Sequence, residues 1–206
     1  MDVILAGITK SFGRETVVRG VDLHLTSGSR TVLLGANGSG KSTLLQLIAG
    51  ALIPTQGKVE HRIADRTIDP EEVYRHVSIA APYLGLYEDL SLRRTVAFHS
   101  RFKPLLGDMG PEELAGHARL AHALDKPVAH FSSGMKQRLK LALAILSDTP
   151  LLLLDEPASN LDAEAIAWYR ELLQTHIGGR TLVVASNRQP AEHDLCTAAI
   201  EVERLK

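Results

Sequence analysis

Hydrophobic and polar positions change their spacing several times along the chain, and each change marks the end of a predicted element. Short apolar or alternating stretches that end at glycine or proline predict strands, whereas apolar residues three and four apart predict helices. The predicted strands cover residues 3–8, 17–18, 21–25, 31–34, 58–62, 77–81, 151–154, 181–185 and 198–202. The predicted helices cover residues 42–49, 91–99, 132–146, 162–176 and 191–195, and one more begins at Pro111. Strands that alternate with helices indicate an α/β fold with a mostly parallel central sheet.

The middle of the chain differs from the rest because the helical pattern dominates there. Ser91, Pro111, and Ser132 or Ser133 are residue types that commonly begin helices. We therefore expect a single domain over residues 1–206, with a helical subdomain inserted at about residues 90–146.

Composition narrows the setting in which the protein works. The 206 residues are 45% hydrophobic and 23% charged, and the formal net charge of -1 gives no overall field that favours nucleic acid. Cys196 is the single cysteine, which excludes an internal disulfide and fits a reducing compartment. The first ten residues do not form a secretory signal, and no apolar run approaches the ~20 residues of a membrane-spanning helix. If the protein works at a membrane, we expect another chain to span it.

A glycine-rich loop follows the predicted strand at residues 31–34. It reads GANGSGKS, in which Gly35 and Gly40 are separated by four residues and Lys41 and Ser42 follow directly. Glycines let backbone N–H groups turn towards phosphate oxygens, while such a lysine reaches the β- and γ-phosphates and the serine hydroxyl holds Mg²⁺. The next helix directs its positive end at the same anion, so an ordinary glycine turn is the weaker alternative. The predicted nucleotide-binding residues of this loop are Gly35, Asn37, Gly38, Ser39, Gly40, Lys41, Ser42 and Thr43.

Two adjacent acids end the apolar run at residues 151–154. Asp155 suits Mg²⁺ held together with Ser42, directly or through water, whereas Glu156 suits the orientation or deprotonation of a water in line with the γ-phosphate. The two acids cannot share one task, since successive strand side chains point in opposite directions. The alternative is a pair of acids that caps a strand-to-loop turn, which the phosphate-binding loop makes less attractive.

A third motif lies just before the acidic pair. The segment FSSGMKQR at residues 131–138 resembles the LSGGQ signature: Ser132 matches its serine and Gly134 its second glycine, while Ser133 and Met135 are variants. The chain thus resembles the ATPase subunit of ATP-binding cassette (ABC) transporters over essentially its whole length, in a form similar to bacterial exporters. The resemblance implies a P-loop NTPase of the ABC type, with a mostly parallel central sheet, an antiparallel β subdomain and an inserted helical subdomain.

The same resemblance implies ligands and partners. Phe12 would stack on adenine, and Ser132 and Gly134 of one subunit would close on the ATP of the other in a homodimer or heterodimer. Residues 159–162 match the D-loop at that interface, and ATP and Mg²⁺ are the implied cofactors. Segment 85–90 resembles the region that docks on a transmembrane permease subunit, which would place the protein in the cytoplasm, peripheral on the inner face of the cell membrane. The implied catalytic residues are Glu156, Lys41 and Asn187.

Two positions depart from the family pattern. Pro82 stands where the family has the Q-loop glutamine, and no glutamine occurs between Gln56 and Gln137. Asn187 stands where the family has a switch histidine, and an asparagine amide donates a hydrogen bond but cannot become cationic or shuttle a proton. We hypothesise that the protein binds ATP normally but hydrolyses it slowly, or needs a partner subunit for full activity.

Two other functions compete with an ATP-hydrolysing transport subunit. The first is a soluble ABC ATPase that serves assembly, translation or repair, although the chain lacks the second cassette of the translation type and the coiled-coil insertion of the repair type. The second is a clamp or regulator that binds ATP without hydrolysing it, which Pro82 and Asn187 encourage.

Overall fold

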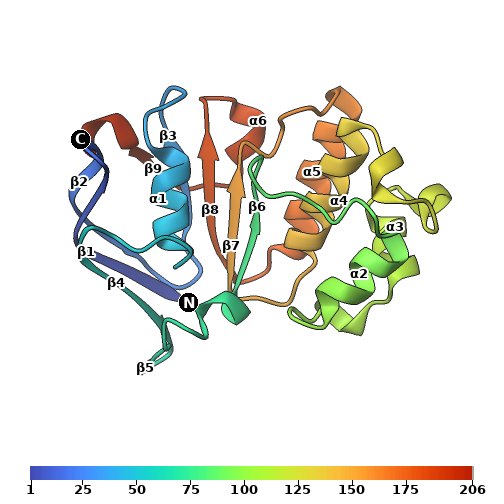
Figure 1. Ribbon diagram of the computed structural model, residues 1–206, viewed down its shortest axis with the longest axis horizontal. Helices are drawn as coiled ribbons and strands as arrows, with labels where there is room; N and C mark the ends of the chain where they lie inside the picture. Colours follow the sequence, from blue (N-terminus) through green and yellow to red (C-terminus); the bar gives the residue numbers. More distant parts are fainter. Residues whose placement is uncertain (206) are drawn as a thin grey trace.

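Two sheets lie side by side in the computed structural model, which describes residues 1–205 (Figure 1). The first sheet is parallel, and its strands have the order β6-β7-β8-β3-β9. All strands of this sheet are short and mostly apolar, as expected for a sheet covered on both faces. They are β3 (Arg30–Leu34), β6 (Val77–Ala80), β7 (Leu151–Asp155), β8 (Thr181–Ser186) and β9 (Ala198–Glu201).

The second sheet is antiparallel, in the order β2-β1-β4-β5. Its strands are β1 (Asp2–Phe12), β2 (Glu15–Leu25), β4 (Gln56–Ile63) and β5 (Arg66–Thr67). The prediction of separate strands at residues 17–18 and 21–25 was wrong, because β2 continues through Gly20. This glycine has a φ of +57° where the pairing with β1 shifts register, and its N–H donates to the Thr9 hydroxyl at 3.0 Å.

The helices within residues 1–205 are α1 (Lys41–Ile48), α2 (Leu92–Ser100), α3 (Pro111–His117), α4 (Ser133–Ile145), α5 (Ala163–His176) and α6 (Pro190–His193). Short 3₁₀ turns lie at Val73–His76, Leu106–Asp108, Ala121–Ala123, Val128–His130 and Val202–Leu205. Ser91 and Ser132 are confirmed as N-caps, and Asp162 caps α5 in the same way: each side chain accepts a hydrogen bond from the backbone N–H three residues on. Within residues 1–205, no helix is long and apolar enough to cross a membrane.

Helix α1 packs between the two sheets, and α2 and α3 lie on the far side of the molecule from the antiparallel sheet (Figure 1). This arrangement confirms the mostly parallel sheet, the antiparallel sheet and the group of helices between β6 and β7. The boundaries of a helical subdomain at residues 90–146 stay a prediction.

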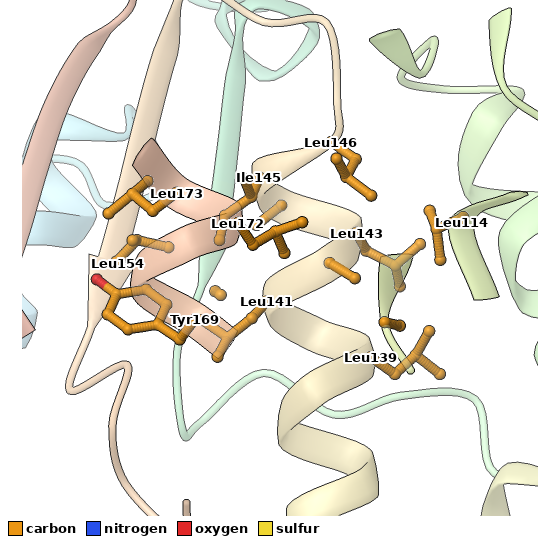
Figure 2. Packing of buried hydrophobic residues seen from close by; sticks show 14 of the residues in the cluster. Leu114, Leu139, Leu141, Leu143, Ile145, Leu146, Leu154, Tyr169, Leu172 and Leu173 are labelled. Atoms are coloured by element: carbon orange, nitrogen blue, oxygen red, sulfur yellow. The ribbon is translucent and has the colours of Figure 1, made fainter. Parts of the chain in front are cut away.

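Helix α4 is fixed by a continuous apolar cluster (Figure 2). Leu139 and every residue from Leu141 to Ile145 are buried, whereas the first turn of α4 is exposed or half-buried, so the C-terminal part of the helix anchors it in the core. Fully burying each leucine stabilises the fold by roughly 1.5–3 kcal/mol. The packing therefore holds the first turn of α4 at a fixed position relative to β7.

Arg180 holds together the opposite end of the same helix. Its guanidinium and Nε donate to the carbonyls of Ile145 (2.6 Å) and Thr149 (2.7 Å), and to the Ser78 hydroxyl on β6 (2.8 Å). Burial lowers the pKa of Arg180 to about 10, against the opposing effect of Asp148, so the side chain stays cationic at neutral pH. Arg180 therefore satisfies the last carbonyls of α4 and links that helix to the sheet.

We expect Arg180→Met to lower the free energy of unfolding by about 3 kcal/mol, because partly buried carbonyls lose a charged donor. Urea denaturation followed by circular dichroism measures this loss. Arg170→Met is the matched control, since Arg170 makes a half-exposed ion pair with Asp194 and should cost under about 1 kcal/mol. Equal losses in the two variants would contradict this role for Arg180.

Candidate functional site

The phosphate-binding loop joins β3 to α1 at the carboxyl edge of the parallel sheet. Gly40 has a φ of +104°, and a Cβ there would lie 2.9 Å from Val17 Cγ1. A Cβ on Gly35 would lie 2.4 Å from the Ser39 hydroxyl. Larger residues are therefore excluded at both positions by backbone conformation or by space, so the spacing of the two glycines follows from the shape of the loop.

The loop forms one wall of a cavity of about 280 Å³, and Glu156 forms part of the other. Two motifs more than 100 positions apart in the sequence thus meet at one place, as the parallel topology requires. The residues that line the cavity are Val17, Asn37, Gly38, Gly40, Lys41, Ser42, Thr43 and Glu156.

Lys41 places its ammonium at the base of the cavity. The side chain is 4% exposed, and Nζ donates to the carbonyls of Gly35 (2.9 Å) and Ala36 (3.0 Å). Nζ also lies 3.9 Å from Glu156 Oε1. A buried cation held by two neutral carbonyls at the start of a helix gives the cavity a strong preference for an anion.

Asp155 is the last residue of β7 and is 2% exposed. Neither carboxylate oxygen has a hydrogen-bond partner within residues 1–205. Burial raises the pKa of the Asp155 carboxyl, while the nearby Ser42 hydroxyl and Lys41 ammonium act in the opposite direction. A buried carboxylate without partners beside a serine hydroxyl is a donor set that fits Mg²⁺.

The side chains of residues 1–205 do not form a complete cation site by themselves. Across the described part of the chain, no group of three or more histidine, cysteine, aspartate or glutamate side chains could hold a metal ion. A cation at Asp155 and Ser42 would therefore take further oxygens from a phosphate ligand or from water, which is how Mg²⁺ usually binds.

Glu156 differs from its neighbour in backbone and in surroundings. Its φ is +46°, which is unusual for a residue with a side chain, and its N–H donates to the Ala185 carbonyl at 2.9 Å. The side chain is 34% exposed and lines the cavity. The two adjacent acids therefore occupy different environments, one buried and one facing the space next to Lys41.

Seven predicted site residues are not among those that line the cavity: Gly35 and Ser39 in the loop, Asp155 at the end of β7, and Phe12, Ser132, Gly134 and Asn187 elsewhere. Phe12 ends β1 and is 51% exposed, with the Lys10 ammonium 5.0 Å from its ring centroid. Asn187 is exposed just after β8. Ser132 and Gly134 begin α4, where Gly134 lies close to the Asn160 carbonyl in the predicted D-loop.

The structure also brings in residues that sequence reasoning missed. Val17 lines the cavity from β2, although nothing in a short apolar strand singles it out. Tyr83 follows Pro82, and its pKa is raised to about 12, by burial first and then by the charge of Asp155.

A strand that runs into this loop, a buried lysine and an acidic pair at the end of a neighbouring parallel strand define a P-loop nucleotide-binding protein. The chain belongs to the ABC transporter family, whose model matches residues 18–159.

The relatives include proteins named for export and for import. The chain is 34% identical to the cytochrome c biogenesis ATP-binding export protein CcmA of Agrobacterium fabrum, over 92% of this chain and 90% of that protein. It is also 34% identical to the sulfate/thiosulfate import ATP-binding protein CysA of Thermosynechococcus vestitus, over 84% of this chain and 53% of that protein.

Solved structures share the fold. The ATP-binding subunit of an ABC transporter superposes with a TM-score of 0.81 at 25% identity, covering 98% of this chain and 87% of that one. A dimeric ATP-binding cassette in a post-hydrolysis state, bound to ADP and Pi, superposes with a TM-score of 0.82 at 24% identity, covering 98% and 95%.

Proposed function

We propose that this chain binds and hydrolyses ATP with Mg²⁺ and drives transport through a separate transmembrane partner. The observation that carries the proposal is the pairing of Lys41 and Glu156 across one cavity, with the partner-free carboxylate of Asp155 beside it. Such sites act by positioning and by electrostatic stabilisation rather than through covalent intermediates.

Each residue has a separate task in this proposal. Lys41 exchanges its carbonyl partners for phosphate oxygens and neutralises their charge. Ser42 and Asp155 hold Mg²⁺, which supplies charge neutralisation at the β- and γ-phosphates when it is bound. Glu156 orients or deprotonates the attacking water, and Phe12 stacks on the adenine. Asn187 donates its amide to the γ-phosphate.

A second copy of the cassette completes the site. Ser132 and Gly134 lie away from the cavity of their own chain, at the capped start of α4, where a helix N-terminus favours an anion. We assign them to the ATP of the opposite subunit in a head-to-tail dimer. ATP then acts as a link between the two copies, and hydrolysis removes it.

An aromatic groove supports the membrane partner. Tyr87, Phe98 and Phe102 form a chain of edge-on contacts with centroids 5.2 Å apart, and all three are at least 38% exposed. They line a cavity of about 320 Å³ that continues into the predicted docking segment 85–90. Exposed aromatic side chains that gather in this way mark an interaction surface. Docking there would hold the chain at the cytoplasmic face of the cell membrane.

The test is steady-state ATP turnover with Mg²⁺, combined with co-purification of a membrane protein after affinity capture from detergent. Turnover and a bound membrane subunit would support the transport function. Turnover without such a subunit would favour the soluble ABC ATPase, and ATP-driven dimerisation without turnover would favour the regulator. No ATP binding at all would overturn the proposal.

We expect Asn187→His to raise kcat at least about tenfold, because a histidine adds a group that can carry a proton and a positive charge. The same turnover assay measures the change. Asn187→Gln is the matched control, since it keeps an amide and should leave kcat unraised. No change, or a fall, in Asn187→His would show that Asn187 does not limit hydrolysis.

A further inference from the structure

One peptide group directly after Glu156 is held at both of its polar atoms by buried side chains. The Pro157 carbonyl accepts a hydrogen bond from Gln137 Nε2 at 3.0 Å, and the Ala158 N–H donates to Glu192 Oε1 at 3.1 Å. Gln137 is 7% exposed and Glu192 is 2% exposed. Burying a polar side chain costs desolvation free energy, and here both buried side chains form a hydrogen bond with the same peptide group.

Glu192 itself is firmly placed. Its second carboxylate oxygen lies 2.5 Å from the Ser186 hydroxyl at the end of β8, and its own backbone carbonyl accepts from the fully buried Tyr169 hydroxyl at 2.8 Å. Within residues 1–205, no lysine or arginine forms an ion pair with it. A buried carboxylate with only neutral donors pays a desolvation penalty without an opposite charge to offset it, so stability alone does not explain Glu192.

The clamped peptide adjoins the strained residue. Glu156 has the left-handed φ of +46°, and its carbonyl accepts from the Ser159 N–H at 3.0 Å, so residues 156–159 form one tight turn. A glutamate keeps such a backbone only where its surroundings enforce it. The clamp at Pro157 and Ala158 enforces it from two sides.

We propose that Gln137 and Glu192 are positioning residues for the Glu156 carboxylate and act through the Pro157–Ala158 peptide. The inference rests on the proposed ATP hydrolysis. Gln137 lies one turn after Ser132 and Gly134, so the helix that closes on the second copy also holds the turn of Glu156 in its own chain. When α4 of one chain closes on the ATP bound to the second copy, it thereby also acts on Glu156 in its own nucleotide site.

The same turn of α4 reaches the predicted docking segment. Lys136 Nζ lies 2.5 Å from Glu88 Oε1, in segment 85–90. A movement of that segment would act on α4 next to Gln137, even though Pro82 provides no glutamine at its own position.

The experiment compares Gln137→Met with wild type. Methionine keeps the length and packing of the side chain but removes the donor. We expect kcat for Mg·ATP to fall about 10- to 100-fold, as for a displaced reacting group, while the KM for ATP changes less than about twofold. Gln174→Met makes the same chemical change on the exposed face of α5 and should leave kcat unchanged.

Two further comparisons separate positioning from a structural role. In a Glu156→Gln background, Gln137→Met should cause no additional loss of residual turnover, because the residue on which it acts is already disabled. Glu192→Leu should lower kcat in the same way, whereas Glu192→Gln keeps an acceptor for the Ala158 N–H and should retain most activity. The Glu192 pair tests the clamp independently if Gln137→Met does not fold.

The outcomes are distinct. Wild-type turnover with unchanged kcat in both Gln137→Met and Glu192→Leu overturns this inference and leaves the proposed function intact. An additive loss in the Glu156→Gln background also overturns it. Wild type that shows no Mg·ATP turnover overturns the proposed hydrolysis and the inference together.

Discussion

Lys41→Ala is expected to weaken ATP binding about 100- to 1,000-fold, which is a loss of about 3–4 kcal/mol in binding free energy. The truncation removes the buried cation that neutralises the phosphate charge in the cavity. The ammonium is 4% exposed, and its partners within residues 1–205 are the Gly35 and Ala36 carbonyls and the more distant Glu156 carboxylate. Few competing partners and little water surround it, so it is available to phosphate.

Titration calorimetry with Mg²⁺ and ATP measures the effect directly. Lys58→Ala is the control, since the Lys58 side chain is 76% exposed on β4 and lies outside the cavity. Binding by Lys41→Ala within about threefold of wild type would contradict the assignment of this loop to phosphate, whatever the family of the chain.

The phosphate-binding loop and the regular elements could be predicted because their signals are local. Gly40 is required by its own φ, and Ser91, Ser132 and Asp162 cap the helices that follow them directly. The spacing of apolar residues predicted most strands and helices because it reflects the direction of consecutive side chains, which is also a local property.

Contacts between distant residues were beyond the sequence. The continuity of β2 through Gly20 depends on pairing with β1, and the roles of Arg180 and Glu192 depend on carbonyls and N–H groups more than 30 positions away. An arginine or glutamate in a sequence is most often exposed, so neither residue type signals burial.

The positions of Phe12, Ser132, Gly134 and Asn187 have a different explanation. Each was assigned to contact a nucleotide or a second copy, and none of them lines the cavity of its own chain. Their roles therefore stay predictions, whereas the geometry already joins Lys41, Ser42 and Glu156.

Glu156→Gln is expected to lower kcat at least about 100-fold, because glutamine cannot accept the proton of the attacking water. ATP affinity should stay within a few fold of wild type, since Lys41 and the loop, not Glu156, hold the phosphates. The glutamine amide also keeps the size of the side chain, so the strained turn at φ +46° is retained. Single-turnover hydrolysis with Mg·ATP measures the rate.

This variant also tests the link between ATP and the second copy. If ATP joins Ser132 of one subunit to the loop of the other, a variant that binds ATP without hydrolysing it should accumulate as a dimer, while wild type returns to monomer as ATP is consumed. Size-exclusion chromatography with light scattering distinguishes the two. Asp155→Asn is the comparison, because it alters the predicted Mg²⁺ site next to Glu156 and should reduce Mg²⁺-dependent binding as well as turnover. A Glu156→Gln protein that hydrolyses at the wild-type rate would mean that another group activates the water, and the adjacent Asp155 is too deeply buried to take over that task.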